Sequence, residues 1–365
     1  MIAMNELLQA MVQKGASDLH LKAGSPAIMR VDGDLYELDD ATISPEDMKE
    51  YAASVMSDKQ IAIFSEQNEI DFAYGLSGVG RFRVNIFRQR GSISIAMRQV
   101  VGKIPNFEEL HLPLLLKKMA LEPRGMVLVT GTTGSGKTTT LAAMIDSIND
   151  NVRRHIVTIE DPIEILHRDK KSLINQREIG IDTRSYSTAL RYVLRQDPDV
   201  IFIGEMRDLE TVRTALTAAQ TGHMVLSTLH TIDVSETINR IIDFFPLHQQ
   251  QQVRIMLAGS LRGVISQRLL QRADGKGRVP ALELMVMTNR IRDLVLDPQQ
   301  TFKIQEAIKE GDYYGMQTFD QSLLQLYRDG LVTLQDAAQV ASSPHDFKLM
   351  AQQEGFDVSL ISGVA

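Results

Sequence analysis

Glycine, threonine and lysine residues near the middle of the chain have the spacing of a phosphate-binding loop. The segment Gly-Thr-Thr-Gly-Ser-Gly-Lys-Thr, residues 131–138, matches that pattern at every fixed position. Its glycines allow the backbone to wrap closely, so that successive N–H groups point at phosphate oxygens. Lys137 offers a positive charge to the β- and γ-phosphates, and the Thr138 hydroxyl is a ligand for Mg²⁺. We therefore expect the cofactors ATP and Mg²⁺, with the nucleotide held by Gly131, Thr132, Thr133, Gly134, Ser135, Gly136, Lys137, Thr138 and Thr139.

Two apolar runs farther along the chain end in acids. Residues 155–159 lead into Glu160, Asp161 and Glu164, and residues 200–203 lead into Glu205. The carboxyl ends of parallel strands form a ligand crevice, so both sets of acids are expected to face the phosphate loop. One acid would hold Mg²⁺ through water and the other would orient the attacking water. A single acid after a strand more often caps a loop, but two such strands favour catalysis, and the residues leave the division of roles open.

A histidine and two arginines complete the candidate chemistry. His230 ends another apolar run, where a γ-phosphate sensor and a residue supporting the site from behind are equally favoured. Arg81 and Arg83 lie two apart in a predicted strand and therefore share one face. Such charges are usually solvated, and the functional alternative is that they close over the nucleotide from another domain, as an arginine finger does.

The elements that must position these residues change character along the chain. Residues 1–100 combine helical spacing with alternating strands, which predicts a small α+β domain with an antiparallel sheet. Residues 101–113 contain two prolines and no clear period, which indicates a linker. Residues 114–290 alternate short apolar strands with helices, which predicts an α/β core with a parallel sheet buried on both faces. Residues 291–365 are predicted to be mainly helical.

The composition excludes several kinds of protein. The net charge is −7, from 39 basic and 46 acidic residues, and there is no tryptophan, so a nucleic-acid motor is disfavoured and no nucleic-acid partner is expected. The chain has no cysteine, which excludes disulfides and thiolate metal sites. No secretory signal and no apolar run of ~18 residues is present, so we expect a cytoplasmic protein without direct membrane insertion. A small-molecule kinase would need an acceptor pocket that the sequence does not reveal.

Taken together, these motifs resemble the secretion ATPases of type II and type IV systems, and within them the PilT-like pilus retraction ATPases. The resemblance runs from about residue 15 to residue 323. Four family boxes occur in order: the phosphate loop at 131–138, an aspartate box at 158–164, a second-acid box at 197–208 and a histidine box at 228–237.

The resemblance implies a PAS-like first domain, a RecA-like P-loop core and a homohexamer held at the inner membrane through a pilus platform protein. It also implies roles for single residues. Glu164 would polarise the attacking water, Glu205 would act on the Mg²⁺ side with Thr138, and His230 would sense the γ-phosphate. Arg81 and Arg83 would reach the phosphates from the first domain.

Within this family, two absences favour pilus retraction over assembly or secretion. Assembly and secretion motors resemble this chain but carry a further N-terminal domain and a four-cysteine zinc site. This sequence starts with the predicted α+β domain and contains no cysteine, so we expect neither feature. Retraction motors carry a C-terminal box close to Ala-Ile-Arg-Asn-Leu-Ile-Arg-Glu. Residues 290–297 read Arg-Ile-Arg-Asp-Leu-Val-Leu-Asp, with Leu296 at the position of the second arginine. An accessory PilU-like subunit that works with a paralogous retraction ATPase is therefore the alternative, and an assembly or secretion ATPase is less favoured.

Overall fold

The computed structural model describes residues 2–31, 33–100, 102 and 104–361. Its contacts divide the chain into two compact units. The first comprises Met1–Lys103 and Glu164–Leu166, and the second comprises Ile104–Ile163 and His167–Ala365. Two residues of the predicted linker, Val101 and Lys103, lie outside the described residues.

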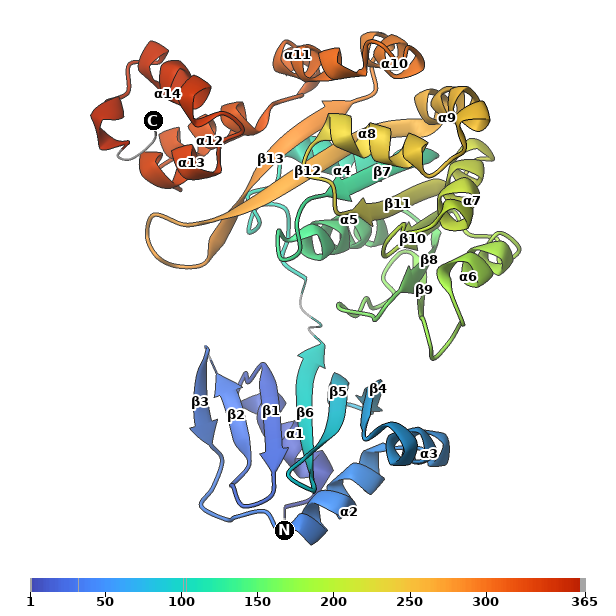
Figure 1. Cartoon of the computed structure of the whole chain (residues 1–365), viewed down its shortest axis with the longest axis vertical. Helices are drawn as coiled ribbons and strands as arrows, with labels where there is room; N and C mark the ends of the chain where they lie inside the picture. Colours follow the sequence, from blue (N-terminus) through green and yellow to red (C-terminus); the bar gives the residue numbers. More distant parts are fainter. Residues whose placement is uncertain (1, 32, 101, 103, 362–365) are drawn as a thin grey trace. The chain divides into compact units, whose positions relative to one another are not determined.

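The first unit is built on a six-stranded antiparallel sheet in the order β3-β2-β1-β6-β5-β4 (Figure 1). Alternation places Phe82, Val84 and Ile86 of β5 in its core, while Arg81 and Arg83 lie on the opposite face of the sheet. The predicted α+β character is therefore confirmed. The elements are α1 (Met4–Gln13), β1 (Asp18–Lys22), β2 (Ile28–Val31), β3 (Asp34–Glu37), α2 (Pro45–Val55), α3 (Asp58–Gln67), β4 (Glu69–Leu76), β5 (Gly80–Gln89) and β6 (Ser92–Val100).

The second unit contains a seven-stranded sheet in the order β13-β12-β7-β11-β10-β8-β9. All neighbouring strands are parallel except β13, which runs antiparallel to β12. Every residue of β7, β10 and β11 is buried, as expected for parallel strands covered by helices on both faces. The predicted parallel sheet is therefore confirmed, with an antiparallel edge strand in addition.

Two layers of helices cover this sheet. One face packs against α4 and α5, and the other packs against helices from α6 to α9, while α10 and α11 pack on α9 and α8 (Figure 1). The core elements are α4 (Leu114–Ala120), β7 (Gly125–Thr130), α5 (Lys137–Asn151), β8 (His155–Glu160), β9 (Leu173–Glu178), α6 (Tyr186–Val193), β10 (Val200–Ile203), α7 (Leu209–Gln220), β11 (Met224–Leu229), α8 (Val234–Asp243), α9 (Leu247–Ser260), β12 (Leu261–Gln271) and β13 (Arg278–Val286).

The rest of the second unit is helical, as predicted. Phe319 and Leu323 of α12 pack with Leu270 and Val279 at the far end of the β12–β13 hairpin, and the Arg268 guanidinium stacks 3.9 Å from the centre of the Phe319 ring. These contacts join the last helices to the core sheet. The elements are α10 (Asn289–Leu296), η1 (Thr301–Lys303), α11 (Ile304–Lys309), η2 (Asp312–Tyr314), α12 (Phe319–Arg328), α13 (Leu334–Val340), α14 (Pro344–Gln353) and η3 (Val358–Leu360).

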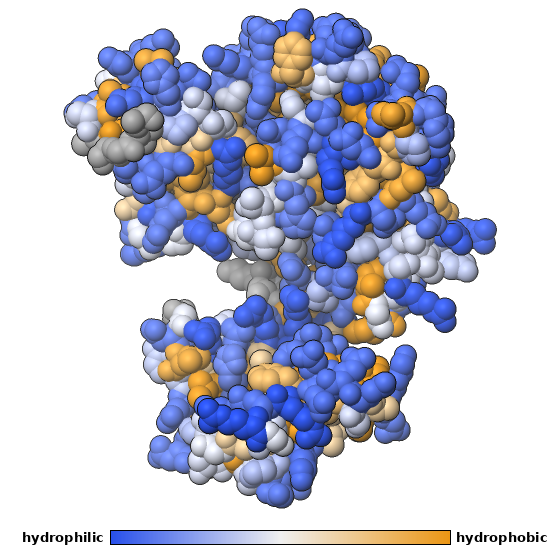
Figure 2. Space-filling view, viewed as in Figure 1, coloured by the Kyte–Doolittle hydropathy of each residue, from blue (hydrophilic) through white to orange (hydrophobic). Residues whose placement is uncertain are grey.

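The surface is mainly hydrophilic on the face that Figure 2 shows, with apolar residues scattered among charged ones. Individual large apolar residues such as Leu247 and Tyr313 are exposed, which is common on protein surfaces. Within the described part of the chain, no helix has both the length and the apolar character that a bilayer crossing requires.

Candidate active site

The carboxyl ends of four neighbouring parallel strands meet at one edge of the second unit's sheet. Their order is β7-β11-β10-β8, and the register pairs Thr130 with Leu229, and Ile203 with both Ser227 and Ile159. The phosphate loop follows β7, His230 follows β11, Glu205 follows β10, and Glu160 ends β8. The structure therefore brings together at one edge the residues that the sequence places after separate apolar runs.

The phosphate loop leads directly into the N-terminus of α5. Gly136 caps the helix with a φ of 91°, a left-handed conformation in which a side chain is strained. Lys137 is the first residue of the helix and is only 8% exposed. Its Nζ donates to the carbonyl oxygens of Gly131 and Thr132, at 2.8 Å and 2.9 Å. The Lys137 ammonium group and the positive end of the α5 dipole therefore both lie at the phosphate loop, and this arrangement favours binding of an anion there.

Gln267, on β12, supports the phosphate loop from behind. A Cβ atom on Gly131 would lie 2.4 Å from the Gln267 carbonyl oxygen, and one on Gly136 would lie 2.7 Å from its Nε2. The Gln267 Oε1 also accepts a 2.8 Å hydrogen bond from Thr140 of α5. These two glycines are therefore required for close packing as well as for backbone conformation.

The loop glycines predict unequal effects of alanine substitution. Gly131→Ala places its Cβ against a backbone oxygen and is expected to cost about 2–4 kcal/mol in free energy of unfolding, from overpacking and left-handed strain combined. Gly134 also has a positive φ, of 81°, but its Cβ would meet nothing within 4 Å. Gly134→Ala should therefore cost only about 1 kcal/mol. Calorimetry of the nucleotide-free variants measures the difference, and equal destabilisation would contradict this account.

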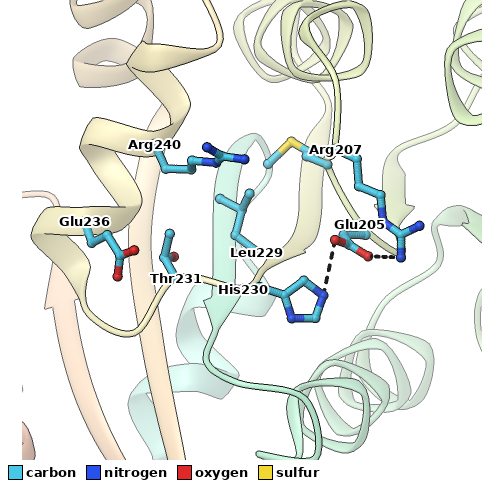
Figure 3. A pocket seen from close by; sticks show the side chains of 8 residues that line it. Glu205, Arg207, Leu229, His230, Thr231, Glu236 and Arg240 are labelled. Carbon is cyan, nitrogen blue, oxygen red and sulfur yellow. Dashed lines mark ion pairs between the residues drawn. The ribbon is translucent and has the colours of Figure 1, made fainter.

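Glu205 is held between two cationic or polar partners (Figure 3). Its Oε2 lies 2.7 Å from Nη2 of Arg207, and its Oε1 lies 3.2 Å from Nε2 of His230. Burial alone would raise the pKa of this carboxyl, but the hydrogen bond from Arg207 and the charges of His230 and Arg207 outweigh burial and lower it. The carboxylate is therefore ionised at neutral pH and is a suitable oxygen ligand for a divalent cation.

A cavity of about 310 Å³ opens beside this pair. Besides Glu205 and His230, it is lined by Glu236 and Arg240 of α8 (Figure 3). Polar groups of both signs therefore line the space next to His230.

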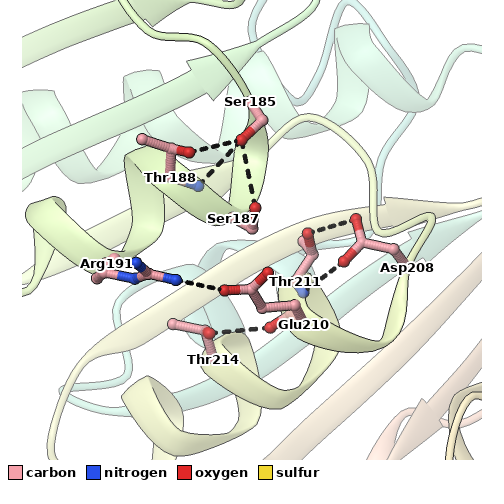
Figure 4. A network of polar contacts seen from close by, with 8 residues as sticks. All are labelled: Ser185, Ser187, Thr188, Arg191, Asp208, Glu210, Thr211 and Thr214. Atoms are coloured by element: carbon pink, nitrogen blue, oxygen red, sulfur yellow. Dashed lines mark hydrogen bonds and ion pairs between the residues drawn. The ribbon is translucent and has the colours of Figure 1, made fainter.

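The loop that carries Glu205 is fixed by a helix cap (Figure 4). Asp208 accepts hydrogen bonds from the backbone N–H and the hydroxyl of Thr211, at 2.9 Å and 2.8 Å, and thereby starts α7. On the neighbouring helix, Arg191 of α6 lies 2.8 Å from Glu210 of α7. The cap lies three residues from Glu205, so it restricts the direction in which the chain leaves β10.

The acids of the 158–164 segment have different surroundings. Glu160 is 6% exposed and accepts from the Thr158 hydroxyl at 2.7 Å and from Gln176 Nε2 at 3.1 Å. Glu164 belongs to the first unit by its contacts. There its Oε1 lies 3.9 Å from Nη1 of Arg83, with both side chains nearly half exposed. An exposed pair at this distance contributes little to stability.

Other arginines of the first unit have structural partners. The Arg98 Nε lies 2.7 Å from the buried carboxylate of Asp18, and the Arg88 guanidinium lies 5.4 Å from the centre of the Phe64 ring. These contacts account for Arg88 and Arg98 without a role in nucleotide chemistry.

Two residues of this site were not predicted from the sequence. Arg207 stands two positions after Glu205, and an arginine so close to a strand-end acid is a local signal that could have identified it. Gln267 lies more than a hundred residues after the loop that it supports, so no local pattern could have found it.

The donor set fits Mg²⁺ by its chemistry. Thr138 supplies a hydroxyl and Glu205 an ionised carboxylate, and Mg²⁺ is commonly held by one or two protein oxygens together with water and substrate phosphates. Among the residues that the structure describes, no group of three or more His, Asp or Glu residues could hold a metal by itself. A Mg²⁺ ion held by Thr138 and Glu205 would take its other ligands from water and from nucleotide phosphates.

Comparison with known proteins extends these findings to the whole chain. Residues 1–282 match the family model described as type II/IV secretion system protein. The type IV pilus retractation ATPase PilT of Pseudomonas aeruginosa is 46% identical over 342 residues, which cover 94% of this chain and 99% of that protein. The type IV pilus ATPase PilU of the same organism is 43% identical over 345 residues, covering 94% of this chain and 90% of that protein.

The backbone is similar as well. A crystal structure of the pilus retraction motor PilT with bound ADP superimposes with a TM-score of 0.87 at 48% identity, covering 95% of this chain and 99% of that one. The similarity therefore includes both units and is not confined to the phosphate loop.

Proposed function

This chain belongs to the type II/IV secretion system protein family, and on that premise we propose that it is a magnesium-dependent ATPase that powers the retraction of type IV pili. The observation that carries the proposal is the edge of the second unit's sheet, where the phosphate loop and an ionised Glu205 paired with His230 follow neighbouring strands. Similarity to PilT over 94% of the chain supports retraction as the task that hydrolysis serves.

In this proposal the second unit binds the nucleotide. The N–H groups of residues 131–139 and the N-terminus of α5 hold the phosphates. Lys137 exchanges its bonds to the loop carbonyls for the β- and γ-phosphate oxygens. Thr138 and Glu205 hold Mg²⁺, which supplies charge neutralisation at the phosphates. The ADP of the similar crystal structure supports a nucleotide as the ligand.

The remaining roles concern the attacking water and the γ-phosphate. Glu164 accepts a proton from the water, His230 responds to the γ-phosphate through its contact with Glu205, and Arg81 and Arg83 neutralise charge on the phosphates. The exposed positions of Glu164 and Arg83 support these roles, because both side chains are free to reorient when nucleotide binds.

We further propose a homohexamer in the cytoplasm that acts on an inner-membrane pilus platform protein. Hydrolysis would move the first unit relative to the second and so drive the ring. An accessory subunit of the PilU kind is the second candidate. The observation that favours it is Leu296, at the end of α10, where retraction motors carry an arginine.

The test is ATP hydrolysis by the purified chain, with oligomer mass measured in the same samples. Magnesium-dependent turnover by hexamers would support a motor. A folded hexamer with little turnover alone, but with strong turnover when a paralogous ATPase is added, would favour the accessory role. Absence of nucleotide binding would reject both.

Arg207 gives a prediction about pH. Arg207→Gln removes the strongest influence that lowers the pKa of Glu205, so this pKa should rise. The acid limb of the kcat/KM profile should then move to higher pH, because Glu205 must be ionised to hold Mg²⁺. Arg191→Gln is the matched control, since it breaks a similar pair with Glu210 on neighbouring helices. An unchanged acid limb in Arg207→Gln would contradict the role of Glu205.

A further inference from the structure

A fully buried carboxyl lies in the β12–β13 hairpin and has no part in the chemistry described above. Glu283 of β13 is 0% exposed and pairs in register with Ser266 of β12. Its Oε1 accepts a 2.8 Å hydrogen bond from the backbone N–H of Val234, and its Oε2 accepts a 2.7 Å hydrogen bond from Nε2 of Gln305. This one side chain therefore connects β13, the N-terminus of α8 and α11.

Burial makes the ionised form of Glu283 energetically unfavourable. Burial raises the pKa of Glu283 to about 7, although the hydrogen bonds from Val234 and Gln305 act in the opposite direction. A buried polar group is tolerated when its hydrogen bonds are made, and both carboxyl oxygens of Glu283 have a partner. The contacts of Glu283 therefore indicate that its carboxylate holds the N-terminus of α8 and Gln305 of α11 in position.

The helix that Glu283 holds begins just after His230. Val234 is the first residue of α8, and Asp233 caps the helix by accepting from Glu236 N–H at 2.7 Å. Glu236 and Arg240 of the same helix line the cavity beside His230 and Glu205 (Figure 3). A displacement of the N-terminus of α8 would therefore displace the short segment that carries His230.

A chain of buried hydroxyls connects the same helix to the phosphate loop. The Thr231 and Thr237 hydroxyl oxygens lie 2.6 Å apart, and Thr237 lies 3.5 Å from the hydroxyl of Thr130. Thr130 is the residue before Gly131, and its hydroxyl donates to Ser266 at 2.9 Å. The start of α8 is thus fixed between the phosphate loop on one side and Glu283 on the other.

We infer that Glu283 is a positioning residue for His230, acting through the N-terminus of α8, and that Gln305 makes α11 part of this support. The inference rests on the proposed ATPase function. It connects α11 to turnover indirectly, through the two hydrogen bonds that Glu283 accepts from Gln305 and Val234.

The test compares Glu283→Ala with Glu283→Gln. Alanine leaves the Val234 N–H and the Gln305 amide without their acceptor. Glutamine still accepts from Val234, and its amide can donate to Gln305 Oε1, a buried atom that has no hydrogen-bond partner among the described residues. The control is Glu306→Ala, which removes an exposed acid next to Gln305 on α11.

Two readouts are measured in each variant. In nucleotide-free protein, amide hydrogen exchange of residues 229–236 should be about 10-fold faster in Glu283→Ala, as expected for the loss of one buried hydrogen bond. With Mg-ATP, kcat should fall about 10-fold while KM changes less, and Glu283→Gln and Glu306→Ala should stay near wild type in both readouts. In a His230→Ala background, adding Glu283→Ala should lower kcat no further, because both act through one group.

Val234→Pro removes the N–H group that donates to Glu283. This variant replaces Glu283→Ala in the test if Glu283→Ala does not fold. Proline is well accepted at the first position of a helix, and Asp233 before it is already extended, with φ −148° and ψ 173°. The same fall in kcat is expected.

The inference is overturned by unchanged exchange in Glu283→Ala, or by a kcat loss that adds fully to that of His230→Ala. Failure of the ATPase proposal is recognised separately, as a wild-type chain that does not turn over ATP. The exchange measurement needs no turnover and remains informative in that case.

Discussion

Lys137→Ala is expected to lower ATP turnover by about 10³-fold. In the proposed mechanism Lys137 meets charge on the β- and γ-phosphates that increases in the transition state, and removing one such preorganised group typically costs a factor of about 10²–10³. The side chain is almost fully buried at the start of α5, so water cannot replace its charge effectively. Phosphate release with Mg-ATP, measured at saturating nucleotide, gives the change in kcat.

A second lysine provides the control for this experiment. Lys170 pairs with Asp146 and Asp150, near the other end of α5, and is 42% exposed. Lys170→Ala should leave turnover within about twofold of wild type, because exposed ion pairs contribute little. Lys137→Ala also removes the donor to two loop carbonyls, so the melting temperature of this variant is measured in parallel. Turnover near the wild-type rate in a folded Lys137→Ala chain would exclude the proposed site.

Local signals in the sequence point to most residues of the candidate site. The phosphate loop has fixed spacing within eight residues, and the acids and His230 each end a run of apolar residues. Because parallel strands share one carboxyl edge, those runs predicted that the acids face the phosphate loop. The contact between Glu205 and His230, 3.2 Å from Oε1 to Nε2, was not itself predicted. The family predicted from the four boxes is confirmed by the match over residues 1–282.

Residues in long-range contacts could not be predicted in the same way. Gln267 reaches the phosphate loop, and Glu283 reaches α8, only because the β12–β13 hairpin packs beside β7 in the sheet. The antiparallel strand β13 was likewise not anticipated, although a short connection after β12 forces the chain to reverse. Pairing between distant segments depends on tertiary packing, which a local pattern does not contain.

Glu160 and Glu164 differ in burial, which the sequence pattern does not predict. In sequence both belong to one box, and their spacing gives them equal standing. In the structure Glu160 is buried against Thr158, whereas Glu164 is about half exposed. Burial distinguishes a carboxylate that holds its own loop in place from one that is free to meet a ligand, and burial is a property of the fold.

Glu164→Gln is expected to retain nucleotide binding and to lower kcat by about 10³-fold. The substitution keeps the size and shape of the side chain but removes its ability to accept a proton from water, a contribution that is typically worth about 10²–10⁴. Because Glu164 is half exposed and its pair with Arg83 is long, little stability should be lost. Fluorescent nucleotide binding and phosphate release, measured on the same preparation, separate the two effects.

Glu160→Gln decides between the two acids of the box. The Thr158 hydroxyl and Gln176 Nε2 both donate to the same oxygen of Glu160, Oε1. A glutamine can keep both hydrogen bonds through its amide oxygen, so the melting temperature of Glu160→Gln should change little. Glu210→Gln, at an exposed position of α7, should change neither binding nor turnover. Wild-type turnover in Glu164→Gln, together with a folded but inactive Glu160→Gln, would transfer the catalytic role to Glu160. Full turnover in both variants would leave Glu205 as the acid that must account for hydrolysis, since it is the remaining strand-end carboxylate beside His230.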